Sequence, residues 1–273
     1  MSEQTIIVKS GKSGNPRDRL LIVTPTLGIV RIEWSIARYR QVVPCNWTIR
    51  SANFGIGCFI PMNYLVADAQ NLGCAELLTS GADWLLFWED DVLPPLDTFL
   101  QLNKYISKVD VPIVSGLYFT KGSHSEPMLY KDLGSGSFRN FKIGDKVWAL
   151  SVPTGILLIH SSIIKLMWKE SEKYTTLGKR VTRRVFATDT ELIFDAESGE
   201  FTTSRGTSDR LWCERVIKEK ILARAGFPKI GRRKYPFLCD TGIFCKHIAL
   251  PTGKIYPSAD VLKEYIKESP GLR

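Results

Sequence analysis

Three consecutive acids follow directly on an uninterrupted apolar run: Trp84-Leu-Leu-Phe-Trp88 leads into Glu89-Asp-Asp91. A run this short and this apolar is typical of a strand that is buried on both faces of a sheet. Three carboxylates at the end of such a strand are costly to pack together unless a cation neutralises them. The double proline that follows, Pro94-Pro95, indicates the start of a helix. An acidic turn with a cap on this helix is the alternative interpretation.

Similar apolar runs alternate with helical patterns along the chain. Strands are expected at Leu20–Thr24, Thr48–Asn53, Asp83–Trp88, Val111–Phe119, Val147–Val152, Gly155–His160, Pro236–Asp240 and Ile243–His247. Helices are expected around Trp34, over Asn63–Ser80, from Pro95 to Ile106, and over residues 161–173 and 208–225. This alternation predicts one α/β domain with a mostly parallel central sheet, helices on both faces and a small antiparallel addition.

The domain is expected to span residues 19–250. Residues 1–18 are polar and without periodicity, which predicts a flexible N-terminal segment. Residues 174–206 are polar and rich in threonine and arginine, which is typical of either a mobile functional loop or a disordered insertion. Residues 251–273 are expected to form a C-terminal tail with a short helix.

The chain has 273 residues, enough for a full hydrophobic core. It contains no apolar stretch near the ~20 residues that a membrane span requires, and its first residues lack the layout of a secretory signal. We therefore expect a cytoplasmic protein without a transmembrane segment. The six cysteines include no CxxC pair, which favours buried free thiols over zinc ligands or disulfides.

Lysine and arginine outnumber aspartate and glutamate, 37 against 28. The excess favours anionic partners, which are the phosphates of a nucleotide, a nucleic acid or membrane headgroups. Part of it lies in two stretches, Lys165–Arg184 and Lys229–Lys234. Solvated basic faces explain both stretches equally well. The sequence indicates no oligomeric state.

The acids after the apolar run point to a metal site. Carboxylate oxygens suit a hard divalent cation that also binds phosphate oxygens. Ligands of open α/β sheets bind at the carboxyl ends of the strands, which is where Glu89, Asp90 and Asp91 are expected.

The order of strand, D-x-D-like acids and proline-led helix resembles the metal-binding element of GT-A glycosyltransferases, in the family-2-like superfamily. That resemblance implies a Rossmann-like GT-A domain that binds a nucleotide-diphosphate sugar. Glu89 stands in the first acidic place, so the match is E-D-D. The resemblance implies that Asp91 binds the metal and that Glu89 lies near the ribose or the metal.

Other segments resemble the family in the same order. Val23–Gly28 is similar to the first-strand loop of the nucleotide pocket, and Ala69-Gln-Asn71 resembles its A-R-N segment, with Gln70 in place of arginine. Pro112–Tyr118 and Val152–Ile159 resemble the strands that flank the sugar. The resemblance thus implies these donor-binding residues: Thr24, Pro25, Thr26, Asn71, Glu89, Asp90, Gly116, Thr154 and Gly155.

Two further residues are implied near the carboxyl terminus. Thr207–Arg215 resembles the S/T-E-D segment that opens the acceptor-side helix, which makes Asp209 the candidate catalytic base, with a helix cap as the alternative. Asp240–His247 resembles the closing strand that supplies a metal-binding histidine, so the implied metal ligands are Asp91, His247 and Glu89. A buried core histidine is the alternative for His247. Imidazole together with carboxylate favours Mn²⁺ over Mg²⁺.

The resulting expectation is a metal-dependent, hexosyltransferase-like glycosyltransferase, which moves a sugar from a nucleotide-diphosphate sugar to an acceptor hydroxyl. The acceptor stays open among a glycan, a protein and modified DNA. One alternative is a sugar-phosphate nucleotidyltransferase, although the loop Thr24–Ile29 lacks the lysine usual in that class. A non-catalytic nucleic-acid-binding protein is the other alternative, suggested by the basic charge alone.

Overall fold

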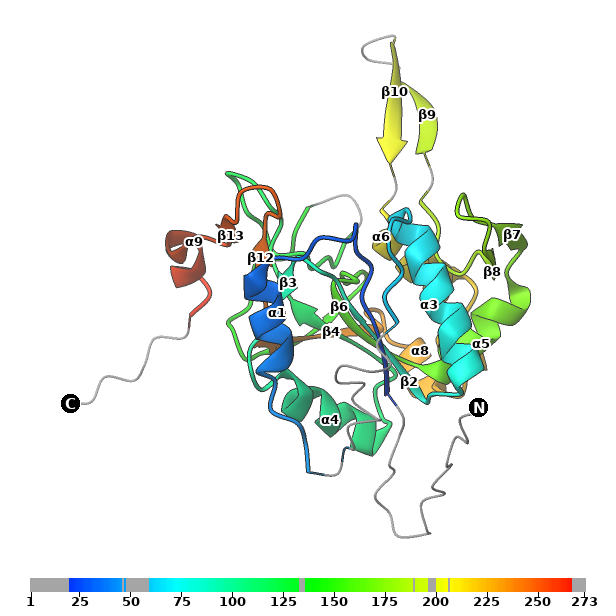
Figure 1. Cartoon of the computed structure of the whole chain (residues 1–273), viewed down its shortest axis with the longest axis horizontal. Coiled ribbons are helices and arrows are strands. Elements are labelled where there is room, and N and C mark those ends of the chain that lie inside the picture. The colour runs from blue at the N-terminus through cyan, green and yellow to red at the C-terminus, as the bar shows by residue number, and fades with distance from the viewer. Residues whose placement is uncertain are drawn as a thin grey trace, which may run out of the picture.

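A six-stranded sheet forms the centre of the chain, with strand order β1-β2-β6-β4-β11-β5 (Figure 1). The computed structural model describes residues 20–45, 47, 59–132, 136–188, 190–195, 200–205 and 207–266. The six strands are β1 Leu20–Val23, β2 Trp84–Trp88, β4 Ile113–Leu117, β5 Lys146–Ala149, β6 Ile156–His160 and β11 Phe237–Phe244.

Four strands of this sheet run in one direction. β1 is parallel to β2, and β4 is parallel to β11. β6 lies between β2 and β4 and is antiparallel to both, and β5 is antiparallel to β11 at the edge. The predicted α/β class, with a mostly parallel sheet and an antiparallel addition, is confirmed. One antiparallel strand lies in the middle of the sheet.

Helices cover both faces of the sheet, as predicted. In Figure 1, α1 and α4 lie on one side of the sheet and α3 and α5 on the other. The helices are α1 Ile32–Tyr39, α3 Val66–Ser80, α4 Thr98–Lys108, α5 Ser161–Glu170, α6 Ser208–Lys218, α7 Ile221–Arg224, α8 Pro228–Gly231 and α9 Ala259–Lys263. Of the helices in the described ranges, none has the length and apolarity needed to cross a membrane.

The two-faced burial of β2 explains its continuous apolar sequence. Trp84, Leu86 and Trp88 belong to the hydrophobic cluster that includes side chains of α1 and α4. Leu85 and Phe87 alternate with them and belong to the cluster under α3, α5 and α6. Because each fully buried large apolar side chain stabilises a fold by about 1.5–3 kcal/mol, this strand holds both layers together.

The boundaries of some elements differ from the prediction. α4 begins at Thr98, after the prolines, and the helix expected over 208–225 ends before Lys220, which has φ 53° and separates α6 from α7. The two strands expected at 236–247 are one strand, β11, whose register shifts after Asp240, followed by β12 Lys246–Ile248. Gly81 ends α3 with φ 63°, as predicted. The strand expected at Thr48–Asn53 and the segment 1–18 lie outside the described residues.

Small antiparallel sheets complete the chain. β3 Val92–Leu93 pairs with β12, which also pairs with β13 Ile255–Tyr256. The stretch 174–206 contains parts of two hairpins, which are formed by β7 Lys173–Thr175 with β8 Val181–Arg183 and by β9 Thr190–Asp195 with β10 Glu200–Arg205. Figure 1 shows β9 and β10 projecting from the body of the domain. The mobility of this stretch stays a prediction.

Asn71 fastens the β7–β8 region to α3. Its side-chain Nδ2 donates to the Phe186 carbonyl and to the Tyr174 hydroxyl, each over 2.9 Å. Its Oδ1 accepts from the Phe186 backbone N–H over 2.8 Å. Thr182 Oγ1 donates to the Asn71 carbonyl over 3.0 Å. The Asn71 amide therefore satisfies a backbone donor and a backbone acceptor that are both buried.

We expect Asn71→Ala to lower the free energy of unfolding by about 2–4 kcal/mol, because it leaves the buried N–H and C=O of Phe186 without partners. Thr79→Ala is the control on the same helix. Thr79 is exposed and bonds only its own helix, to the Ala75 carbonyl, so its loss should cost under about 0.5 kcal/mol. Urea unfolding of both variants measures the difference; equal stabilities would contradict the anchoring role of Asn71.

Candidate active site

Polar side chains collect at one edge of the central sheet, where the four parallel-running strands end. β1 leads into Thr24 and Thr26, and β2 leads into the acids 89–91. β4 leads into Tyr118 and Lys121, and β11 leads through β12 to His247. The carboxyl ends of parallel strands are the usual ligand site of open α/β sheets. This edge is therefore the candidate active site.

Asp91 and His247 meet at this edge through strand pairing. β12 pairs with β3 so that His247 lies opposite Val92, and Ile248 N donates to the Asp91 carbonyl over 2.8 Å. His247 Nε2 lies 3.3 Å from Asp91 Oδ2. His247 Nδ1 donates to the Phe119 carbonyl over 2.8 Å, which fixes the orientation of the ring with Nε2 facing Asp91. The two predicted metal ligands are thus brought together.

Lys121 forms an ion pair with the same carboxylate, at Asp91 Oδ2. Burial raises the pKa of Asp91, but the hydrogen bond and charge of His247 and the charge of Lys121 outweigh it and hold that pKa below its usual range. The other oxygen, Asp91 Oδ1, is buried and accepts no hydrogen bond. Asp91 is therefore ionised, with one oxygen left for a further cation or donor.

Tyr118 packs against the ring of His247. Its ring stands edge-on to the His247 ring, with centroids 5.1 Å apart. The Tyr118 hydroxyl accepts from Gly155 N over 2.9 Å. A Cβ on Gly155 would lie 2.5 Å from that hydroxyl oxygen, so only glycine lets the tyrosine approach. Gly155, a predicted donor-binding residue, therefore allows Tyr118 to pack closely within the site.

Glu89 is held neutral at ordinary pH. Burial, followed by the charge of Asp91, raises the pKa of Glu89 to about 8. Glu89 Oε1 accepts from Thr154 Oγ1 over 3.1 Å, and that hydroxyl accepts from Gln70 Nε2 over 3.1 Å. The Trp34 indole N–H donates to the Glu89 carbonyl over 2.9 Å. Predicted residues Glu89 and Thr154 are therefore neighbours in one hydrogen-bonded chain.

Asp90 faces the loop that follows β1. Its side chain is buried, which raises its pKa, while a hydrogen bond with Thr26 acts in the opposite direction. Asp90 Oδ2 is buried and accepts no hydrogen bond. The loop itself is fixed by its backbone, since Thr24 N donates to the Phe59 carbonyl and Thr26 N to the Pro61 carbonyl, over 3.0 and 3.3 Å. Between the two threonines, Pro25 is buried as well.

Asp209 lies in the first turn of α6 and is half-buried. Its negative charge contributes to the raised pKa values of Glu89 and Tyr118, so it acts on the site electrostatically. Asp209 Oδ1 accepts from the Arg210 backbone N–H over 2.8 Å. The carboxylate thus bonds the backbone in the first turn of α6. Its role as a catalytic base stays a prediction.

Two predicted donor-binding residues lie apart from the acids. The Asn71 amide is engaged with the β7–β8 region, as described above. Gly116 is enclosed in β4: a Cβ there would lie 2.6 Å from Ile156 Cγ2 and 2.9 Å from the Ile243 carbonyl oxygen. Close packing explains this glycine. A donor contact for either residue stays a prediction.

Lys121 and Tyr118 are members of the site that the sequence did not single out. Both follow the strand at 113–117, at its carboxyl end. The acids were identified because they follow a buried strand. Tyr118 and Lys121 also follow a buried strand, β4, so the same criterion could have identified them. Which of the polar residues there would point at Asp91 depended on the fold of the loop.

Asp91 and His247 fit a cation that shares its ligands with a substrate. Within the described ranges, no group of three or more His, Cys, Asp and Glu residues is placed to hold a metal ion. A closed structural site, which needs about four protein ligands, is therefore not formed there. The Asp91 carboxylate, whose Oδ1 has no hydrogen-bond partner, and His247 Nε2 supply two ligands of the type that Mn²⁺ accepts. Phosphate oxygens and water would have to complete the set.

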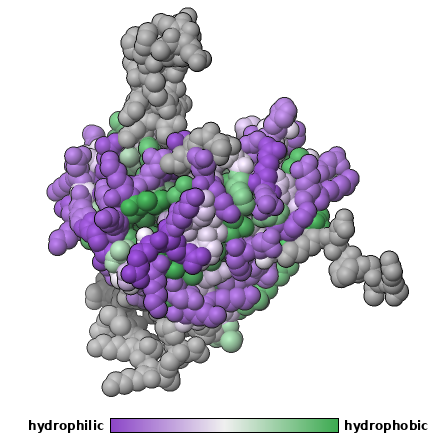
Figure 2. All heavy atoms as spheres, turned by 180° about the vertical axis from the view of Figure 1, so that it is seen from behind, coloured by the Kyte–Doolittle hydropathy of each residue, from purple (hydrophilic) through white to green (hydrophobic). Residues whose placement is uncertain are grey.

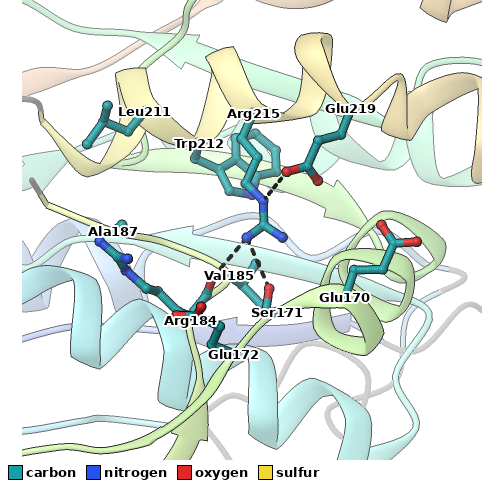
Figure 3. Close-up of a pocket in the computed structure, with 10 residues that line it drawn as sticks. All are labelled: Glu170, Ser171, Glu172, Arg184, Val185, Ala187, Leu211, Trp212, Arg215 and Glu219. Atoms are coloured by element: carbon teal, nitrogen blue, oxygen red, sulfur yellow. Dashed lines mark hydrogen bonds and ion pairs between the residues drawn. The ribbon is translucent and has the colours of Figure 1, made fainter.

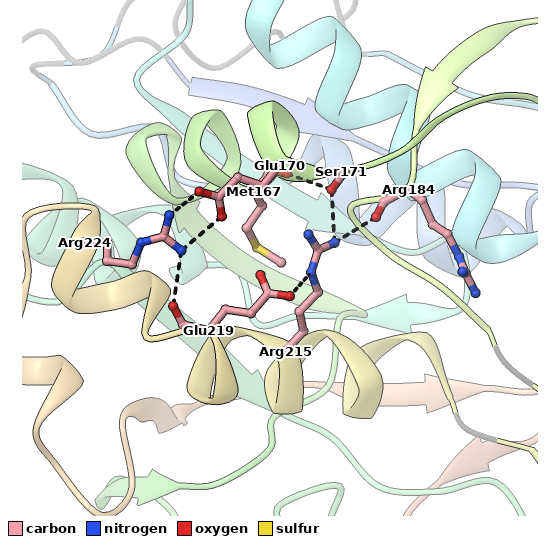
Figure 4. Close-up of polar contacts among 7 residues, drawn as sticks. All are labelled: Met167, Glu170, Ser171, Arg184, Arg215, Glu219 and Arg224. Carbon is pink, nitrogen blue, oxygen red and sulfur yellow. Dashed lines mark hydrogen bonds and ion pairs between the residues drawn. The ribbon is translucent and has the colours of Figure 1, made fainter.

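A separate pocket of about 330 Å³ lies between α5, residues 184–187 and α6 (Figure 3). Arg215 crosses it: its Nη1 donates to Ser171 Oγ over 3.0 Å and to the Arg184 carbonyl over 2.8 Å, and its Nε donates to Glu219. Figure 4 shows the neighbouring ion pair between Arg224 and Glu170. The Arg215 contacts tie α6, which carries Asp209, to Ser171 at the end of α5, and the Arg224–Glu170 pair ties α7 to α5.

Comparison with solved structures bears on the fold alone. The crystal structure of A197 from STIV is similar with a TM-score of 0.50 at 13% sequence identity, covering 93% of this chain and 100% of A197. S. aureus TarS has a TM-score of 0.38 at 9% identity, covering 71% of this chain and 32% of TarS. A glycosyltransferase involved in glycosylation of the major capsid of PBCV-1 has a TM-score of 0.28 at 11% identity, covering 55% of this chain and 66% of its own. The similarity to A197 indicates that the two chains share a fold.

No protein-family model matches the sequence, and the comparison with curated proteins finds no match.

We expect Glu89→Gln to stabilise the metal-free protein increasingly as pH rises from 5 to 8. Glu89 is protonated in the folded state up to a pKa of about 8, whereas the unfolded chain loses this proton near the ordinary glutamate pKa of 4.5. Folding of the wild type therefore loses stability with rising pH across that window and levels off above it. Glutamine keeps the acceptor for Thr154 and does not titrate. Melting temperatures measured at a series of pH values in EDTA test this.

The control for that series is Glu172→Gln, at an exposed position. It should follow the wild type at every pH. A constant difference in melting temperature between Glu89→Gln and the wild type from pH 5 to 9 would contradict the raised pKa.

Proposed function

We propose that the chain is a nucleotide-sugar-dependent glycosyltransferase, which transfers a sugar from a nucleotide-diphosphate sugar to an acceptor hydroxyl. The observation that supports it most is the convergence of His247 Nε2 and Asp91 Oδ2, 3.3 Å apart, at the carboxyl edge of the sheet. A histidine and a carboxylate from opposite ends of the chain meet there beside two further acids. Structural packing alone gives no reason to bury that many carboxylates together.

In this proposal the donor lies across the carboxyl ends of β1 and β2. Neutral Glu89 can donate a hydrogen bond to a ribose hydroxyl, which an ionised glutamate cannot do. The orphaned oxygen of Asp90 lies near the Thr26 loop, where it can accept from a base or ribose. Nucleotide recognition is thus assigned to the side of the site opposite His247.

Asp91 and His247 would hold a divalent cation together with the donor diphosphate. When bound, Mn²⁺ or Mg²⁺ neutralises negative charge on the diphosphate as it leaves the sugar. Lys121 occupies Asp91 Oδ2 in the metal-free protein, so it competes with the cation for that oxygen. Once displaced, its ammonium group lies near the phosphates and can bind them. Tyr118 and the Phe119 carbonyl keep the imidazole in position throughout.

Asp209 is the proposed base for the acceptor hydroxyl. It lies in the first turn of α6, and its charge contributes to the raised pKa of Glu89. A carboxylate that removes a proton from the acceptor makes its oxygen a better nucleophile. The acceptor itself, which we leave open among a glycan, a protein and modified DNA, would approach along the N-terminal end of α6.

The metal assignment predicts that two substitutions weaken Mn²⁺-dependent binding and that a third strengthens Mn²⁺ binding. Asp91→Asn and His247→Ala should each weaken Mn²⁺-dependent binding of a nucleoside diphosphate by at least about tenfold, because each removes a ligand. Lys121→Gln should strengthen Mn²⁺ binding, because the competing cation is gone. Calorimetry with UDP, GDP, ADP and TDP, with and without Mn²⁺, measures these changes. Undiminished Mn²⁺-dependent binding in both ligand variants would remove the metal site from the proposal.

Asp209→Asn separates catalysis from helix capping. Asparagine keeps the acceptor for the Arg210 N–H and removes the basicity, so the variant should melt near wild type and bind donor normally. Transfer to an identified acceptor should slow by at least ~100-fold in a single turnover. Arg210→Gln, at the exposed neighbouring position, is the control and should transfer at nearly the wild-type rate. Near-normal transfer by Asp209→Asn would leave Asp209 as a cap.

A further inference from the structure

A group of exposed apolar side chains lies where α1 and α3 begin. The loop after β1 exposes Leu27 to 71% and Ile29 to 82%, and Ile32, the first residue of α1, is 69% exposed. Leu65, which precedes α3, is 67% exposed. Single exposed apolar residues are ordinary, but a contiguous group of large ones marks a surface that binds something.

Backbone pairing and packing hold these segments together as one surface. Thr26 forms a β-bridge with Met62, so the loop after β1 lies against the segment before α3. The turn between β7 and β8 packs on Tyr64, since a Cβ on Gly178 would lie 2.6 Å from Tyr64 Cε1. That turn adds Leu177, which is 88% exposed. We call this surface the apolar rim; it consists of Leu27, Ile29, Ile32, Met62, Leu65 and Leu177.

The rim lies around the starts of α1 and α3. α1 and α3 face the viewer in Figure 1. Figure 2 shows the opposite face, where hydrophilic residues dominate and hydrophobic ones form small separate groups.

The β7–β8 hairpin gives the rim a strongly basic border. From Lys173 to Thr188 the sequence contains five lysines and arginines and no acid. Lys179 and Arg180 follow Leu177 closely at the turn, and both are exposed. A basic border repels a second copy of itself and attracts anionic headgroups. Apolar side chains edged by lysine and arginine are typical of proteins that lie in a membrane interface.

We propose that the apolar rim and the β7–β8 hairpin dock the protein on an anionic lipid bilayer. Ile29 and Leu177 enter the boundary between headgroups and acyl chains, and Lys179 and Arg180 bind the headgroups. The rim starts at the loop after β1, so docking holds the candidate active site close to the membrane surface. This docking does not depend on the proposed sugar transfer.

Co-sedimentation with vesicles tests the proposal. Wild type should pellet with phosphatidylcholine vesicles that contain about 30% phosphatidylglycerol, and pellet less with pure phosphatidylcholine. The double variant Ile29→Glu with Leu177→Glu should bind at least ~10-fold more weakly, since burying one such side chain changes an equilibrium by about 10- to 100-fold. Lys179→Gln with Arg180→Gln should lose the preference for the anionic vesicles.

Leu100→Glu on α4, which lies away from the rim in Figure 1, is the control and should bind like wild type. All the substituted residues are exposed, so melting temperatures should stay near wild type and confirm folding. The proposal is overturned if wild type pellets with neither vesicle, or if the rim variants pellet like wild type. Light scattering that finds a wild-type dimer, and a monomer for the double variant without vesicle binding, would also overturn it in favour of self-association.

Discussion

The pairing of β12 with β3 is the contact on which the candidate site depends. It places His247 opposite Val92 and so beside Asp91. The hydrogen bond from Ile248 N to the Asp91 carbonyl fixes this register from the backbone. The other contacts around the proposed metal ligands require the same register. One of them is the hydrogen bond from His247 Nδ1 to the Phe119 carbonyl. A slip of one residue would turn the imidazole to the other face of the sheet.

The fold and the core of the site were predictable because they follow from local patterns. Continuous apolar runs predicted strands buried on both faces, and β2 is such a strand. The histidine of the closing strand was identified through the resemblance to GT-A glycosyltransferases, and the acids after β2 were identified by their place at a strand end. That rule needs only the direction of the strands, which alternation with helices supplies.

Features that depend on pairing between distant segments were not predictable. β6 lies antiparallel in the middle of the sheet because Gly155–His160 returns between β2 and β4, and no local pattern encodes that neighbour choice. The hydrogen bonds of the Asn71 amide depend on Phe186, which lies far from it in the sequence. Lys121 differs from other lysines of the chain only through the loop that aims it at Asp91. Contacts of this kind follow from the whole fold.

The acids next to β2 have a second effect before the protein is folded. Trp84 finds its register partners at Leu20 and His160, so β2 stays unpaired until distant parts of the chain have met. Meanwhile Trp84–Trp88 is a short, uncharged, strand-forming segment, the type that initiates aggregation. Glu89, Asp90 and Asp91 flank it directly, as gatekeeper charges do. Substitutions that neutralise these carboxylates therefore carry a cost in the yield of folded protein, apart from anything that they do to the site.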